Sequence, residues 1–392
     1  MSGDLTLKLV KILGSPFLEE NLPVEREIES RNLYILAVKN KIPLLYLEAV
    51  RKRGELKKLD SAYKEEKVRY QNLISSLSKI SKVLNSAKID YCIVKTIRPF
   101  PSVPGDVDIL ILGDKRMFKE AIVALLKAGF VPQLRELVDV GALKNDVEYW
   151  KAAELLSRPT YGGGKYGLKH ISPTGTDLVD VEFAVDVDLQ IELALSYVVY
   201  LDKRSFFGRL TEIELQNGAK ITVPIPELDL TVMIAHSLME QMFLLGEFYT
   251  LLYRLYEFDD KEIENFVRIL RENRLVSASR SFLTISAALH QRAFGMLPEK
   301  MQYLLDELGY DSAEEKRIAS FGFKVPHKYG LRTVLGVFLE KTREKNFMKS
   351  LCVQALKTLN PKMARLVLKS IIDMRKREYY LKDRRLEGEG DG

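Results

Sequence analysis

The spacing of apolar residues divides the chain into two helical ends and a different centre. Residues 5–87 carry apolar positions at helical intervals, such as Leu33 and Leu36, so a helical N-terminal segment is predicted. We interpret this segment as a packing scaffold, because amphipathic helices usually serve hydrophobic cores. Within it, the charged stretch Arg51–Tyr70 is expected to be a solvated helix or a connector. From Pro226 almost to the end the chain is predicted to be helical, and apolar residues recur there every four positions at Leu230, Ile234, Leu238 and Met242.

In the centre, short β-prone runs alternate with turns. The run Tyr91–Val94 is apolar and predicts a buried strand. A loop with three prolines follows and ends at Gly105, and Asp106–Leu112 predicts a second strand. Asp114 is a suitable N-cap for the next helix, which should end near Gly129. Further strands are predicted at residues 178–193, 211–215 and 221–223.

These patterns predict an α/β (α+β) protein with a mixed β-sheet core. At 392 residues the chain exceeds the usual size of one domain, so two or three domains are expected. We place the core at residues 88–225, between a helical N-terminal segment at 1–87 and a helical C-terminal domain at 226–386. Residues 387–392 are glycine and acidic residues only, and they are expected to be a disordered tail.

Composition and charge exclude several classes of protein. The 60 basic residues nearly balance the 54 acidic ones, and a net charge of +6 is too small for a protein that coats nucleic acid by charge alone. Cys92, Cys352 and the four histidines show no zinc-ligand spacing, and His236 is interpreted as a core histidine. No stretch approaches the roughly 18 apolar residues of a membrane span, and the N-terminus lacks a secretion signal. We therefore expect a cytoplasmic protein with no membrane partner.

One part of the C-terminal region is distinctly basic. Residues 332–385 contain 15 Lys and Arg against 5 Asp and Glu, with Phe338, Phe347, Tyr379 and Tyr380 between them. Such a composition is typical of a surface that follows a phosphate backbone, which makes RNA a possible partner. A solvated helix with lysines along its exposed side explains the same composition.

The sharpest chemical feature is the pair Asp106 and Asp108, separated by Val107 at the start of an apolar strand. Side chains alternate between the faces of a strand, so both carboxylates are expected on one face, roughly 7 Å apart along the backbone. Two like charges there repel each other unless a cation lies between them, and carboxylate oxygens suit Mg²⁺ or Mn²⁺. The polar start of a strand that leaves a turn would also explain the pair.

The segment before the aspartates resembles the nucleotidyltransferase superfamily, which has the DNA polymerase β-like fold. Its members carry a strand, a tight turn, about ten residues and then a carboxylate–apolar–carboxylate strand, as Val94-Lys95-Thr96 and Asp106–Ile109 do here. More narrowly, the chain is similar to an uncharacterised archaeal and bacterial branch whose turn reads apolar-Lys-Gly or Lys-Thr. The resemblance spans residues 30–260, but only residues 91–130 are specific.

The resemblance implies a third carboxylate on a later strand. Asp188 is the first choice, because Val187–Gln190 resembles the apolar-Asp-Leu-His element of the family, and Asp180 is the second. Glu182 and Asp186 share the same even spacing, and at least two of these four acids must belong to a solvent face. Asp106, Asp108 and Asp188 are thus the expected catalytic residues and the expected ligands of Mg²⁺ or Mn²⁺.

The same resemblance implies that Lys95 and Thr96 bind the nucleotide. The family has a glycine at this turn, where backbone amides approach the triphosphate. Here Thr96 would offer a hydroxyl and an amide, and Lys95 a positive charge. The function implied is transfer of a nucleoside monophosphate from an NTP to an acceptor hydroxyl, on an RNA end, a protein or a small molecule. A catalytically inactive binding or regulatory protein with the same fold, and an RNA-binding protein, are the alternatives.

Overall fold

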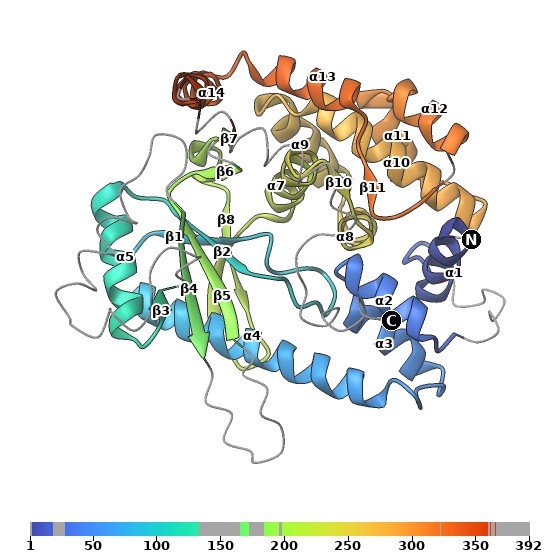
Figure 1. Ribbon diagram of the computed structural model, residues 1–392, viewed down its shortest axis with the longest axis horizontal. Coiled ribbons are helices and arrows are strands. Elements are labelled where there is room, and N and C mark those ends of the chain that lie inside the picture. Colours follow the sequence, from blue (N-terminus) through green and yellow to red (C-terminus); the bar gives the residue numbers. More distant parts are fainter. Residues whose placement is uncertain are drawn as a thin grey trace.

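A computed structural model describes residues 2–18, 28–132, 165–171, 184–195, 198–321 and 323–359, together with residues 361 and 365. The chain has the predicted mixed α+β architecture, in which a β-sheet and its covering helices adjoin a larger group of helices (Figure 1). The helices before the sheet are α1 (Ser2–Leu13), α2 (Arg31–Lys39), α3 (Pro43–Lys52) and α4 (Asp60–Ser86). The sheet strands are β1 (Tyr91–Val94), β2 (Val107–Ile111), β3 (Val131–Pro132), β4 (Lys165–Ile171) and β5 (Ala184–Gln190), with helix α5 (Lys115–Lys127) between β2 and β3.

The chain then forms short strands and returns to helices. Three small two-stranded sheets are made of β6 (Leu193–Leu195) with β7 (Val198–Leu201), β8 (Leu210–Glu214) with β9 (Lys220–Pro224), and β10 (Met242–Phe243) with β11 (His327–Lys328). The later helices are α7 (Pro226–Met239), α8 (Leu245–Glu257), α9 (Asp260–Glu272), α10 (Val276–Phe294), α11 (Glu299–Leu308), α12 (Ser312–Phe321), α13 (Leu331–Lys341) and α14 (Lys345–Thr358).

The main sheet has the strand order β1-β2-β5-β4-β3. Only β2 and β5 run parallel, and the other neighbouring strands are antiparallel. In this register Asp108 of β2 lies between Val94 of β1 and Asp188 of β5. The pairing therefore brings together two acidic residues that are 80 positions apart in the sequence.

One face of the sheet is covered by α4 and α5 (Figure 1). Ile93 and Ile109 point to this side and share a core with Leu77 of α4 and Phe118 of α5. The charged stretch Arg51–Tyr70, expected to be a solvated helix or a connector, contains both: the end of α3, a short connection that includes Gly54, and the start of α4. From Asp60 to Ser86 the sequence has no glycine or proline, so the charged first turns continue as one helix.

The opposite face of the sheet belongs to a second, larger core. Cys92, Val94 and Leu110 pack there with residues of α7, α8 and α10 and also with the N-terminal helices α1–α3. Because strand side chains alternate, Asp108 lies on the same side of β2 as Leu110. The division into parts at 1–87, 88–225 and 226–386 stays a prediction, and the N-terminal helices share their core with the C-terminal ones.

The local signals around α5 are confirmed. The Asp114 side chain accepts hydrogen bonds from the backbone N–H groups of Arg116 and Met117, at 2.9 and 3.0 Å, as an N-cap should. The helix ends at Lys127, and Gly129 takes a φ of +90°, a conformation that favours glycine. This helix therefore begins and ends where its sequence predicts.

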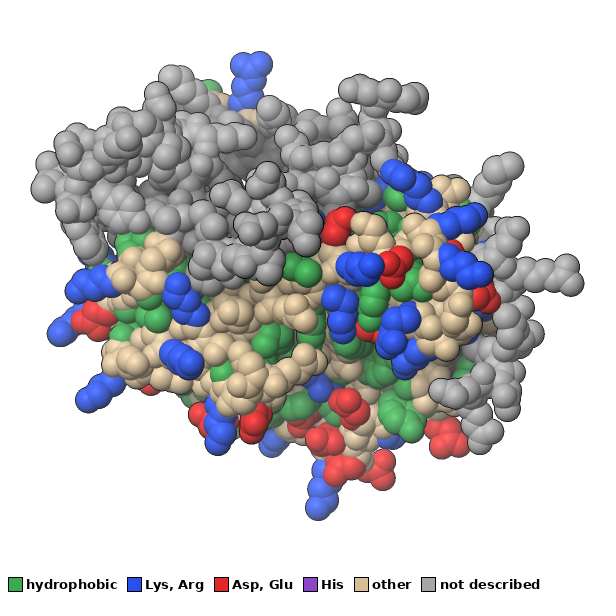
Figure 2. Space-filling view, turned by 90° about the horizontal axis from the view of Figure 1, so that it is seen from below, with side chains coloured by type: hydrophobic (Ala, Val, Ile, Leu, Met, Phe, Trp, Pro, Cys, Tyr) green, Lys and Arg blue, Asp and Glu red, His purple; other side chains and the backbone are tan. Residues whose placement is uncertain are grey.

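Of the basic segment at 332–385, the structure describes residues 332–359, 361 and 365. There Phe347 is buried and its ring meets that of Phe338 edge-on at 5.5 Å, so these two aromatic residues pack together. Figure 2 views the molecule from the side opposite α13 and α14, and on the described part of that face basic and acidic side chains are interspersed. Tyr379, Tyr380 and the tail at 387–392 lie outside the described residues. Among the helices that the structure describes, none is long and apolar enough to cross a bilayer.

Candidate active site

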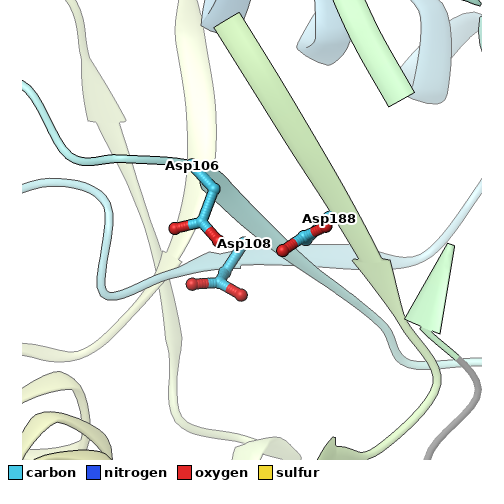
Figure 3. A group of neighbouring side chains, drawn as sticks. All are labelled: Asp106, Asp108 and Asp188. Atoms are coloured by element: carbon cyan, nitrogen blue, oxygen red, sulfur yellow. The ribbon is translucent and has the colours of Figure 1, made fainter. Parts of the chain in front are cut away.

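The carboxylates of Asp106, Asp108 and Asp188 converge beside the parallel pair β2 and β5 (Figure 3). One oxygen from each lies within 4.8 Å of the others, and Asp108 and Asp188 are buried. We call these three residues the acidic triad. Hard oxygen ligands that converge at this spacing can hold a divalent metal ion. Asp106 precedes β2 instead of opening it, since the strand begins at Val107.

Among the described residues, Asp186 is the other acid considered for the third position, and it does not join the triad. Asp186 lies two residues before Asp188 in β5 and is only partly buried. Asp180 and Glu182 lie outside the described residues. The parallel pairing of β2 with β5 is what places Asp188, and not Asp186, directly beside Asp108.

A pocket with about 700 Å³ of empty space, its open mouth included, adjoins the triad. Asp106 and Asp108 line it, together with Lys41, Lys95, Arg98, Gln190, His236 and Glu247. These residues come from the turn after α2, from the sheet and the loop between β1 and β2, and from α7 and α8. The pocket therefore combines anionic and cationic side chains, as a site for a metal-bound phosphate requires.

Lys95, Gln190 and Thr96 hold Asp108 in place. Its Oδ2 is 3.0 Å from the Nζ of Lys95, and its Oδ1 accepts a hydrogen bond from the side-chain amide of Gln190. Its backbone N–H donates to the hydroxyl of Thr96 at 3.2 Å, and that hydroxyl donates to the carbonyl of Val94 at 3.1 Å. The Thr96 side chain thus ties the end of β1 to β2 and fixes the backbone that carries Asp108.

Lys95 occupies an unusual backbone conformation directly after β1. Its φ is +56°, which costs a residue with a side chain roughly 1–2 kcal/mol. Its N–H donates to Oδ1 of Asp229 at 3.2 Å, and its Nζ is 3.4 Å from Nδ1 of His236. Burial lowers the pKa of the Lys95 ammonium, but Asp108, Tyr200 and Asp106 raise it, and the net result is a pKa above its usual range.

His236 is mostly buried, as the interpretation of a core histidine requires, but it also lines the pocket. It does so from α7, its side chain is 17% exposed, and Nε2 lies 3.8 Å from Oε1 of Glu240. The apolar pattern of the helix indicated burial correctly but did not show that one position opens onto a pocket.

Three further charged pocket residues were not found from the sequence. Lys41, Arg98 and Glu247 form a group in which burial lowers the pKa values of Lys41 and Arg98, and the charge of Glu247 partly opposes this. Burial likewise raises the pKa of Glu247, against the opposing charges of Lys41 and Arg98. Arg98 is fixed by hydrogen bonds to the Gly246 carbonyl at 2.9 Å and the Thr250 hydroxyl at 2.6 Å.

Lys41 reaches the pocket because the preceding residue is attached to helix α8. Asn40 is fully buried, its Oδ1 accepts the N–H of Leu245 at 3.1 Å, and its carbonyl accepts the N–H of Gly246 at 3.0 Å. Gly246 allows this close approach, because a Cβ there would lie 3.1 Å from the Asn40 carbonyl oxygen. The turn after α2 is thereby fixed to the start of α8.

Replacing Asn40 with alanine is expected to destabilise the protein by about 1–3 kcal/mol, because the buried N–H of Leu245 loses its acceptor. Displacement of Lys41 should accompany this loss. Urea unfolding followed by circular dichroism measures the change. Asn85→Ala is the matched control, because Asn85 is exposed on α4 and should change stability by less than about 0.5 kcal/mol. Equal effects of the two changes would contradict the attachment.

Comparisons with known proteins add little to this geometry. No protein-family model matches the chain, and no curated protein matches it. Among solved structures, the chain is similar to the crystal structure of an antigenic nucleotidyltransferase-like protein from Paracoccidioides brasiliensis. The likeness covers 63% of this chain and 90% of that one, at 16% identity and a TM-score of 0.28. A TM-score this low carries no argument, so the function is inferred from the site.

Proposed function

We propose that the protein is a metal-dependent nucleotidyltransferase, which moves a nucleoside monophosphate from an NTP to an acceptor hydroxyl. The observation that carries this proposal is the convergence of Asp106, Asp108 and Asp188 within 4.8 Å, beside a pocket that also holds cationic side chains. The triad suits Mg²⁺ or Mn²⁺, because both are hard cations that prefer carboxylate oxygens and keep positions open for phosphate and water.

In the proposed reaction the acceptor oxygen attacks the α-phosphorus in line. A new phosphorus–oxygen bond forms while the bond from the α-phosphorus to the bridging oxygen breaks, and pyrophosphate leaves. The hydroxyl proton passes to a carboxylate of the triad. A bound divalent ion would supply positive charge to the entering and leaving oxygens. Placement of the reactants and neutralisation of phosphate charge provide most of the rate, and no covalent enzyme intermediate is needed.

The nucleotide would be bound by the cationic wall of the pocket. We propose that Lys95, together with Lys41 and Arg98, contacts the phosphates, because all three line the pocket beside Asp106 and Asp108. The Thr96 hydroxyl is engaged in hydrogen bonds to the Val94 carbonyl and the Asp108 N–H. We therefore propose that Thr96 supports nucleotide binding indirectly, by holding Asp108 in position. The proposal allows three classes of acceptor, namely an RNA end, a protein and a small molecule.

A catalytically inactive nucleotide-binding or regulatory protein is the second candidate. The ion pair between Lys95 and Asp108 favours it, because that lysine competes with a metal ion for one oxygen of the triad. The two candidates differ in turnover and not in nucleotide binding. Release of pyrophosphate from an NTP in the presence of cell extract, as a source of acceptors, separates them.

Asp106→Asn is expected to weaken NTP binding at least about tenfold in the presence of Mg²⁺, because the cation that joins protein and triphosphate loses one anionic ligand. Removal of the metal with EDTA should have a similar effect on the wild type. Isothermal titration calorimetry measures both. Asp186→Asn is the matched control, since Asp186 lies in β5 but outside the triad. Identical NTP affinity with and without metal, in wild type and variant, would contradict the proposal that NTP binding depends on a metal ion at the triad.

A further inference from the structure

The ammonium group of Lys95 forms an ion pair with one carboxylate of the acidic triad. Its Nζ lies 3.0 Å from Oδ2 of Asp108, and the two side chains are only 10% and 9% exposed. Water and salt screen a shielded pair of charges much less than an exposed pair. Lys95 therefore acts as a strong positive charge on any divalent ion that the triad binds.

The fold holds Lys95 at this position from both ends. Its backbone N–H donates to Asp229 in the first turn of α7, at 3.2 Å, and its Nζ is 3.4 Å from Nδ1 of His236, also on α7. Its backbone is in the left-handed conformation, which a residue with a side chain adopts only when its surroundings fix it. The ammonium therefore lies between two polar partners, Asp108 and His236.

Asp108 meets a hydrogen-bond donor on each of its two oxygens. Oδ2 pairs with Lys95, and Oδ1 accepts from the side-chain amide of Gln190, which is buried beside it. Each donor occupies a lone-pair direction that a metal ion would otherwise use. Lys95 therefore competes with a metal ion at Oδ2 of Asp108, and Gln190 competes at Oδ1.

The ammonium of Lys95 also offsets part of the negative charge of the triad, as a metal ion would. Many enzymes that cleave or form phosphate esters use two metal ions about 3.5–4 Å apart. We propose that here Lys95 takes the place of one of two such ions, so that the triad binds a single Mg²⁺ or Mn²⁺. This inference rests on the proposed function, because it assumes that the triad binds a metal at all. Lys95 would then supply to the phosphates the positive charge that the second metal ion supplies in two-metal enzymes.

The test is the number of Mn²⁺ ions bound by the full chain. Titration followed by the electron paramagnetic resonance of free Mn²⁺ gives stoichiometry and affinity, and ions lost in Asp106→Asn are assigned to the triad. We expect one triad ion in the wild type. In Lys95→Met we expect a second ion, or the first bound at least about tenfold more tightly, because a neighbouring positive charge is gone. Lys95→Arg keeps the charge and should bind one ion, and Lys52→Met, at an exposed lysine of α3, is the surface control.

Each result has a definite meaning. Two triad ions in the wild type would overturn the inference, and this measurement does not require any Lys95 variant to fold. One ion of unchanged affinity in a Lys95→Met protein with wild-type melting behaviour would overturn it as well. No triad ion in either protein would instead remove the metal site, and with it the proposed function and this inference. One ion in the wild type and in Lys95→Arg, with more or tighter binding in Lys95→Met, supports it.

Discussion

Asp188→Asn is expected to lower NTP-dependent pyrophosphate release roughly 10³-fold, in line with losses seen when one preorganised electrostatic group is removed from an active site. Asp188 is 3% exposed and adjoins Asp108 in the parallel register of β2 and β5, so no water can easily replace its carboxylate as a ligand. A coupled assay for pyrophosphate, with cell extract as the source of acceptors, measures the loss.

The same change should not lower the melting temperature of the metal-free protein. The triad places three like charges within 4.8 Å, and removal of one of them relieves repulsion that folding must otherwise overcome. Asp186→Asn, two residues earlier on β5, should keep both activity and melting temperature. Loss of activity together with loss of folding would assign Asp188 a structural role, and full activity would exclude it from the reaction.

Ile109→Ala is expected to destabilise the protein by about 2–5 kcal/mol, because it removes a fully buried side chain and leaves a cavity between β2, α4 and α5. Ile109 follows Asp108 directly but lies on the opposite face of the strand. Urea unfolding monitored by circular dichroism gives the change. NTP affinity, measured at a temperature where the variant is folded, should stay within a few-fold of wild type.

The control for this change is Leu339→Ala on α13. Leu339 is 68% exposed, so its truncation should alter stability by less than about 0.5 kcal/mol. A loss below about 1 kcal/mol in Ile109→Ala would mean that the sheet is not packed against α4 and α5 as described. A parallel loss of NTP binding in the folded variant would mean that the two faces of β2 are coupled.

The sequence by itself determined the features that depend on near neighbours. The run Tyr91–Val94 forms β1 because apolar, β-prone residues between turns favour a buried strand. Asp114 caps α5 because its carboxylate reaches N–H groups two and three residues ahead. The pair Asp106 and Asp108 was visible for the same reason, since both acids sit within three positions at the start of β2.

Tertiary structure decided how distant residues meet this pair. The sequence favoured Asp188 only through the resemblance of Val187–Gln190 to a family element, and the parallel register of β2 with β5 is what places Asp188 beside Asp108. Lys41 lies in the pocket through hydrogen bonds between Asn40 and the start of α8, more than 200 positions later. His236 joins through its contact with Lys95, 141 positions away. Charged and polar side chains carry no periodic signal of their own, so their convergence depends on how the sheet and the two groups of helices pack.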